Sequence, residues 1–146
     1  MKTIIQRVSS ASVTVNGTVT GSINKGYVIL LGIGNSDSRT DVERLVDKIQ
    51  KLRIFNDENG KINLSINEVG GGILVISQFT LYADCKKNRP GFTDAAPPAL
   101  AEELYNYFIE YARSGNKFAA VESGSFGAMM NVELINEGPF TIILES

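Results

Sequence analysis

The chain of 146 residues is long enough for one domain with its own core, carries a net charge of −2, and contains no histidine and a single cysteine, Cys85. These counts exclude a Ser-His-Asp triad, a Cys-His dyad, a zinc site built on histidine or on several thiolates, and an internal disulfide. We expect no metal or other cofactor. The weak net charge argues against a protein that wraps long nucleic acid, the short N-terminal apolar pair against a signal peptide, and the lack of any long apolar segment against a membrane span. The single cysteine agrees with a cytoplasmic protein.

The first third of the chain shows strand patterns. We expect a strand at residues 4–8, a hairpin at residues 13–21 and a strand at residues 26–33. Asn16-Gly17 favours the type I′ turn of the hairpin, because both residues tolerate positive φ angles. The run at residues 26–33, GYVILLGI, is continuously apolar between glycines, which is typical of a central strand buried on both faces.

After residue 40 the pattern changes to the period of a helix. Apolar side chains recur at the i, i+3, i+4, i+7 spacing of one helix face, at Val42, Leu45, Val46, Ile49 and Leu52. The segment Thr40-Asp41-Val42-Glu43 matches a capping box. The sequence therefore predicts a helix at residues 41–52.

The middle of the chain returns to strand patterns. A turn is expected at residues 56–61, followed by a short strand at residues 62–66. Three glycines at residues 70–72 then precede a strand at residues 73–83. Residues 86–98 carry basic residues and prolines and are expected to form a loop.

The last third predicts a second helix and two more strands. Pro98 suits the first turn of the helix, and Gly115 is a plausible terminator. The apolar stripe of this helix consists of Leu100, Leu104, Tyr107, Phe108 and Tyr111. Strands follow at about residues 129–136 and 140–145, with Gly138-Pro139 between them. One β-rich domain at residues 1–146 with two inserted helices is of the α+β class.

Three polar side chains interrupt the otherwise apolar strand at residues 73–83. In a regular strand Gln78 and Thr80 point to one face, and Ser77 and Phe79 to the other. One interpretation is a sheet edge whose polar groups are satisfied structurally. The other is one wall of a cleft, where these side chains and nearby backbone N–H groups meet a ligand and stabilise an oxyanion.

Two further features also have two interpretations each. Gly138-Pro139 is either a plain turn or a cis-proline turn whose carbonyl groups are held in a fixed direction beside a ligand. Lys86, Lys87 and Arg89 are either a solvated part of the loop or a local phosphate contact beside the cleft.

Several segments of the chain resemble the D-aminoacyl-tRNA deacylase family, and the resemblance runs from end to end. It rests above all on LVISQFTLYAD, NRPGF and NVELINEGPFTIILES, and the pairing of Ser-Gln-Phe-Thr-Leu with a C-terminal Gly-Pro is highly specific. The chain departs from the family pattern at Gly91, where serine is frequent, and at Phe140, where valine is common.

The resemblance implies a cytoplasmic homodimer with a β-rich, barrel-like fold. It implies hydrolysis of the ester between a D-amino acid and the terminal adenosine of tRNA, and also activity on glycine mischarged onto tRNA for alanine. In the family, a Gly-cis-Pro dipeptide of one subunit enters the active site of the other, where its carbonyls exclude L-side chains. These residues correspond to Gly138 and Pro139 here.

The resemblance also suggests how the reaction proceeds without histidine. The family's other hallmark maps onto residues 77–81, of which Ser77, Gln78, Phe79 and Thr80 would position the aminoacyl group and the adenosine. No base is visible in the sequence that would activate Thr80 as a nucleophile, and the terminal 2′-hydroxyl of the tRNA is expected to assist instead.

Two alternatives remain open. One is the sister activity on L-alanine mischarged to tRNA for threonine, which would need a trans Gly-Pro bond. The other is a non-catalytic module that binds tRNA ends or proteins.

Overall fold

Most strands belong to one six-stranded mixed sheet. A computed structural model describes all 146 residues. The strand order in this sheet is β2 (Thr18–Ile23), β1 (Lys2–Val15), β3 (Gly26–Gly32), β6 (Gly72–Ser77) and β7 (Val121–Ser123). The sixth strand, β8 (Asn131–Glu145), pairs with β1. The pairs β3–β6 and β6–β7 are parallel, whereas β1 runs antiparallel to each of its partners. A separate antiparallel pair consists of β4 (Arg53–Asn56) and β5 (Ile62–Ser65).

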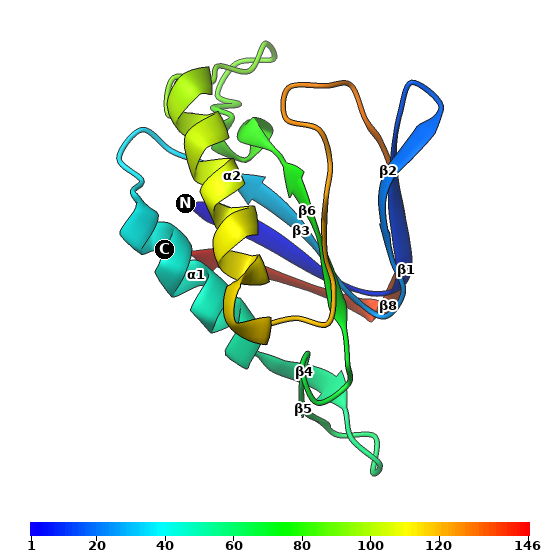
Figure 1. Cartoon of the computed structure of the whole chain (residues 1–146). Coiled ribbons are helices and arrows are strands. Elements are labelled where there is room, and N and C mark those ends of the chain that lie inside the picture. Colours follow the sequence, from blue (N-terminus) through cyan, green and yellow to red (C-terminus); the bar gives the residue numbers. More distant parts are fainter.

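The two main helices lie side by side against the same face of the sheet (Figure 1). They are α1 (Arg39–Lys51) and α2 (Pro98–Arg113), and each buries one apolar stripe, which is why both sequences have the period of a helix. A core of 23 buried residues, among them Ile29, Val46 and Phe108, fills the space between helices and sheet. Burial of this core is the main source of stability of the fold.

The sheet is curved, and its opposite face encloses a smaller core. Seven buried residues, including Val28 and Leu74, form this second cluster. Gly21 of β2 lies so close to β7 that a Cβ on it would be 2.9 Å from the carbonyl oxygen of Ser123. The sheet is therefore nearly closed, and the expected α+β class with a barrel-like sheet and two helices is confirmed.

Both predicted helices are present, with two changes. In α2 the expected stripe is only partly right: Leu100, Tyr107 and Tyr111 are partly buried, and the buried face consists of Ala101, Leu104, Tyr105, Phe108, Ile109 and Ala112. The other change is at the start of α1. Helix α1 begins at Arg39, two residues earlier than expected, and its N-cap is Ser38 instead of Thr40. The backbone N–H of Ser38 donates to Asp41 Oδ2 at 2.9 Å, and the Ser38 hydroxyl bonds the same oxygen. These two bonds hold the pKa of Asp41 below its usual range.

The strands at the two ends of the chain are longer than expected. The turn at Asn16-Gly17 has the anticipated positive φ angles, 50° and 77°. However, β1 is one strand from Lys2 to Val15, and the two strands expected near the C-terminus are one strand, β8. Both expectations were wrong for the same reason: β1 and β8 pair with each other along almost their whole length, and irregular register absorbs the interruptions. The short strand β7 was not predicted.

No helix in the structure combines the length and the apolar character that a membrane span would need.

Candidate active site

The segment Ser77–Thr80 is not a continuing strand. β6 ends at Ser77, and a 3₁₀ helix at Phe79–Tyr82 follows, so the expected strand to residue 83 is wrong. The N–H of Gln78 makes the last bond to β3, with Leu31 O at 2.8 Å, and β3 itself ends at Gly32. Beyond this point the chain has no partner strand, and it turns across Gly32, where a Cβ would lie 2.9 Å from the Leu81 Cβ.

The turn nevertheless brings the polar groups of this segment together. Gln78 Nε2 donates to Thr80 Oγ1 at 2.5 Å, although strand alternation is not the cause of their proximity. The N–H groups of Phe79 and Thr80 are the first two of the 3₁₀ helix, and such groups have no acceptor within their own helix. Phe79 is 53% exposed, so this cluster of donors and hydroxyls faces the surface of the single chain. Donors of this kind are suited to stabilising an oxyanion.

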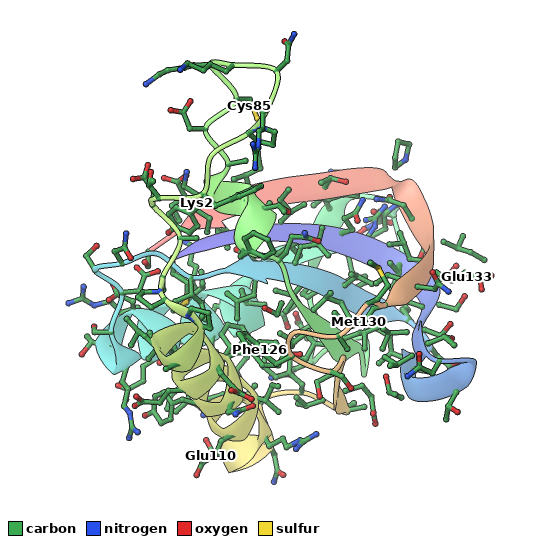
Figure 2. The ribbon with its side chains drawn as sticks, turned by 90° about the horizontal axis from the view of Figure 1, so that it is seen from above. Lys2, Cys85, Glu110, Phe126, Met130 and Glu133 are labelled. Carbon is green, nitrogen blue, oxygen red and sulfur yellow. The ribbon has the colours of Figure 1, made fainter.

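A second loop, residues 124–130, is fixed beside the end of β6. Tyr105 of α2 donates its hydroxyl proton to Val75 O or Gly124 O, which lie 2.9 and 3.2 Å away, and Gly124 N donates to Val75 O at 3.1 Å. Burial raises the pKa of Tyr105 to about 12, so the hydroxyl stays protonated. Figure 2 shows Phe126 and Met130 on this loop, and the Phe126 ring packs against Tyr105.

The segment around Gly138-Pro139 forms the other half of the predicted site. The peptide bond between these residues is cis, the state that the sequence leaves open, and Gly138 has a φ of 150°. Phe140 N donates to Asn136 Oδ1 at 2.6 Å, which closes the turn from inside. Gly138 and Pro139 are exposed, so a firmly held turn is presented at the surface.

Arg7 holds this turn from below. It is 7% exposed, and its Nε donates to Glu137 O at 2.8 Å while Nη1 donates to Ile54 O at 2.7 Å and Asn56 Oδ1 at 3.1 Å. The guanidinium also lies 4.7 Å from the centroid of the Phe140 ring, so the Phe140 side chain packs against Arg7. The planar fork of arginine suits such divergent acceptors.

The sequence interpretation missed Arg7, although a signal was present. Thr3, Ile5 and Arg7 share one face of β1, and all three are buried. An arginine on the buried face of an alternating strand needs several partners, and that requirement alone marks the position as unusual.

A single chain does not bring the two halves of the predicted site together. Two strands, β1 and β3, separate β8 from β6, which corresponds to about 14 Å across the sheet. Along the strands, Arg7 is level with Tyr27 whereas Ser77 is level with Leu31, an offset of about 13 Å. Ser77, Gln78, Phe79 and Thr80 thus form one group, and Gly138 and Pro139 form another.

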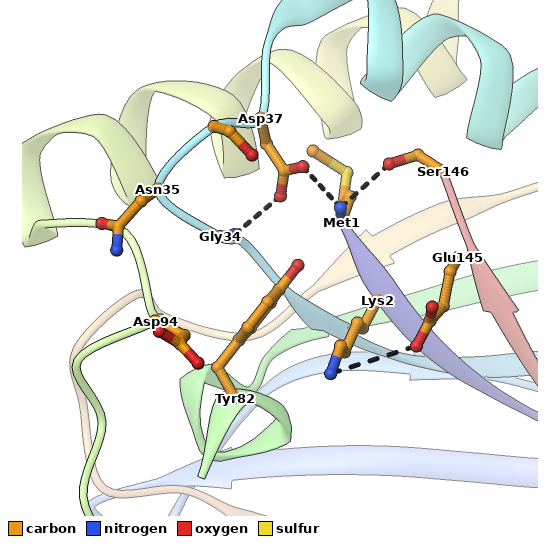
Figure 3. A pocket seen from close by; sticks show the side chains of 10 residues that line it. Met1, Lys2, Gly34, Asn35, Asp37, Tyr82, Asp94, Glu145 and Ser146 are labelled. Carbon is orange, nitrogen blue, oxygen red and sulfur yellow. Dashed lines mark hydrogen bonds and ion pairs between the residues drawn. The ribbon is translucent and has the colours of Figure 1, made fainter. Parts of the chain in front are cut away.

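A polar cavity lies behind the 3₁₀ helix and does not include Ser77–Thr80. It has a volume of about 440 Å³, and Asp37, Tyr82 and Asp94 are among its lining residues (Figure 3). Asp37 is fully engaged there, because it accepts from the Met1 amine at 2.5 Å and from Gly34 N at 2.6 Å. No three His, Cys, Asp or Glu side chains gather anywhere in a way that could hold a metal ion.

Comparisons with known proteins agree on one family. A family model described as D-Tyr-tRNA(Tyr) deacylase matches residues 4–145. A protein of Desulfatibacillum aliphaticivorans called D-aminoacyl-tRNA deacylase is 55% identical, with 100% of this chain and 99% of that protein covered. A protein of the same name from Clostridioides difficile (strain 630) is 52% identical, with 100% of this chain and 97% of that protein covered.

Solved structures show the same fold. A structure described as c-Myc DNA Unwinding Element Binding Protein matches with a TM-score of 0.94 at 44% identity, covering 100% of this chain and 99% of that one. A probable eukaryotic D-amino acid tRNA deacylase matches with a TM-score of 0.83 at 18% identity, covering 98% and 97%, which is a likeness of fold alone.

Proposed function

Because this chain belongs to the D-Tyr-tRNA(Tyr) deacylase family and is a hydrolase of the D-aminoacyl-tRNA ester bond, we propose that it selects its substrates by excluding L-side chains with Gly138-Pro139. The observation that carries the proposal is the rigid, exposed turn at these residues. Arg7 and Asn136 fix the turn by hydrogen bonds to Glu137 and Phe140, which flank it on either side. A fixed carbonyl can reject one enantiomer by steric and polar conflict without binding the other.

The proposed site needs two copies of the chain. Within one chain the turn lies far from Ser77–Thr80, and neither segment alone encloses a substrate. β8 pairs only with β1, so its other edge is free, and it carries the exposed apolar side chains Val132, Ile135 and Ile143. An isologous homodimer would bury this strand and place Gly138-Pro139 of one copy against Ser77–Thr80 of the other.

The chemistry proposed for this site is ester hydrolysis by water. Water attacks the ester carbonyl, the bond to the terminal ribose oxygen breaks, and the free amino acid and tRNA leave. The N–H groups of Phe79 and Thr80 would stabilise the negative charge that develops on the carbonyl oxygen. The 2′-hydroxyl of the terminal adenosine would assist in the proton transfers, since the chain contains no histidine. A substrate of this class also supports a cytoplasmic location.

One assay tests this function against its alternatives. We expect the protein to release the amino acid from D-Tyr-tRNA and from glycine mischarged onto tRNA for alanine, and to leave L-Tyr-tRNA intact. Glycine is accepted because it has no side chain to exclude. Equal cleavage of D- and L-Tyr-tRNA would refute exclusion. Selective loss of L-alanine from tRNA for threonine would favour the sister activity, and no ester loss at all would favour a binding module.

Thr80 is proposed as a positioning residue and not as a nucleophile. Its hydroxyl oxygen already accepts a hydrogen bond from Gln78 Nε2. The sequence also shows no residue that would act as the base needed to activate this hydroxyl. We expect Thr80→Ser to retain most of the deacylation rate and Thr80→Ala to retain part of it. Mass spectrometry of the quenched reaction should find no aminoacyl group on the protein, and an aminoacyl-Thr80 adduct would overturn this assignment.

A further inference from the structure

The loop that follows the 3₁₀ helix is closed and anchored. Asp84 N donates to Gly91 O at 2.8 Å and Gly91 N donates to Asp84 O at 2.9 Å, so residues 84–91 form a closed loop. Its base is tied to the body of the protein, because Asn35 Nδ2 donates to Thr93 O at 2.8 Å. Figure 2 shows Cys85 on this loop, which projects away from the sheet. The loop therefore presents its side chains to solvent from a defined place.

The projecting part of the loop is strongly basic. Lys86, Lys87 and Arg89 are all exposed, and they lie within four residues of a chain whose net charge is −2. Lys86 is paired with Asp84 at 3.6 Å. The side chains of Lys87 and Arg89 make no ion pair or hydrogen bond, unlike that of Lys86. Two unpaired cations at one projecting point are free to meet an anionic partner.

This basic loop is coupled to the proposed site through an aromatic contact. Phe92, directly after the loop, packs edge-to-face on Phe79 with 5.0 Å between ring centroids. Phe79 precedes Thr80, where the terminal adenosine and its amino acid are proposed to lie. A polynucleotide that ends at Thr80 carries a phosphate at every nucleotide before its end, and the Phe92–Phe79 contact places the basic loop next to that end.

From this arrangement we propose that Lys87 and Arg89 bind phosphate groups of the nucleotides that precede the terminal adenosine of the substrate. The proposal rests on the proposed function of the neighbouring site. It assigns the loop to the nucleic-acid part of the substrate, whereas Ser77–Thr80 contact its aminoacyl end. Arginine and lysine are the side chains that neutralise phosphates, and each phosphate neutralised releases condensed counterions and makes binding dependent on salt.

The test compares two substrates in a Lys87→Gln/Arg89→Gln double variant. D-Tyr-tRNA carries the phosphates, and D-tyrosyl-adenosine carries the same ester without them. We expect the KM for D-Tyr-tRNA to rise about tenfold with kcat unchanged, and the rate on D-tyrosyl-adenosine to stay at the wild-type level. The slope of log(kcat/KM) against log[salt] should become shallower by about 1.4, since a single strand contributes about 0.7 per phosphate contact.

The matched control is a Lys48→Gln/Lys61→Gln double variant. It makes the same change in charge at one exposed position on α1 and one in the β4–β5 hairpin. Figure 1 shows this hairpin at the opposite end of the molecule from the loop, and α1 runs toward it. We expect this control to behave as the wild type on both substrates.

Three outcomes would overturn the proposal. Equal losses on both substrates would mean that the loop shapes the site, and no loss on either would mean that it takes no part. A loss on D-Tyr-tRNA with an unchanged salt slope would indicate a contact that is not to phosphate. If the proposed function itself fails, the wild-type protein hydrolyses neither substrate, which is distinguishable from all three.

Discussion

Replacing Arg7 with alanine is expected to lower kcat/KM for D-Tyr-tRNA by about 100-fold, because the turn at Gly138 loses the group that fixes it. The change also leaves Glu137 O and Ile54 O without the charged donor they now have. Unpaired acceptors in a buried place destabilise the fold, here by about 3 kcal/mol of unfolding free energy. Urea denaturation and single-turnover deacylation measure the two effects separately.

Arg7→Lys separates positioning from stability. Lysine keeps the charge and part of the packing, but its one nitrogen cannot take the places of both Nε and Nη1, which now donate to Glu137 O and Ile54 O. We expect this variant to stay folded at the assay temperature and yet to cleave L-Tyr-tRNA measurably. Arg44→Ala, an exposed arginine on α1, is the control. Full chiral selectivity in a folded Arg7→Lys protein would contradict the assigned role.

The second large effect is expected from a single methyl group on Gly138. In Gly138→Ala the new Cβ would lie 2.7 Å from Phe140 N and 3.4 Å from Arg7 Nη2, at a φ of 150° that favours glycine. The turn must move, and a displacement of about 1 Å of a substrate-positioning group is enough for a loss of about 100-fold in rate. Because the residue is exposed, the loss of stability should stay within about 1–3 kcal/mol.

Gly60→Ala is the matched control for this variant. Gly60 also has a positive φ, 73°, but no atom lies within 4 Å of a Cβ built there, and it belongs to the β4–β5 turn. We expect Gly60→Ala to show a backbone penalty that is smaller, because a φ of 73° lies near the left-handed helical region that L-residues can adopt, and to leave the kinetics unchanged. Loss of activity in both variants would mean that general destabilisation, and not the position of the turn, is responsible.

Mixing two variants of reduced activity tests whether the turn acts across a dimer. One variant is Gly138→Ala and the other is Phe79→Ala/Thr80→Ala. In a mixed dimer one of the two sites would take Ser77–Thr80 from the first chain and Gly138-Pro139 from the second, so it would be wild type. After subunit exchange about a quarter of the wild-type activity should return. No recovery despite proven exchange would place both segments of each site in one chain.

The sequence was most informative where local patterns agree with the tertiary structure. The helix spacing from Val42 to Ile49 and the Asn16-Gly17 turn predict their elements because each depends on neighbouring residues alone. The strand expected through residue 83 failed for a tertiary reason. Residues beyond Ser77 suit a strand, but β3 ends at Gly32, so they have nothing to pair with and turn into a 3₁₀ helix.

The candidate site shows the same division. Ser77, Gln78, Thr80, Gly138 and Pro139 were predicted because polar groups and a Gly-Pro pair interrupt apolar runs, and their role stays a prediction. Arg7 was missed because its role depends on Glu137 and Ile54, which lie 130 and 47 residues away in the sequence. The separation of the two halves across β1 and β3 likewise depends on strand order, which no local pattern contains.

The pairing of the first strand with the last has a consequence for how the protein is made. The hydroxyl of Thr3 donates to Leu144 O across 141 positions of the chain, and the pairing of β1 with β8 begins with Thr14 and Asn131. At the usual pace of translation, one edge of β1 remains without its partner strand for roughly 6 to 23 seconds after Thr14 is synthesised. During that time the open edge is a template for pairing with other nascent chains. A protein that removes errors of tRNA charging thus completes its own sheet, and with it the Gly-Pro turn, only after residues 131–145 have left the ribosome.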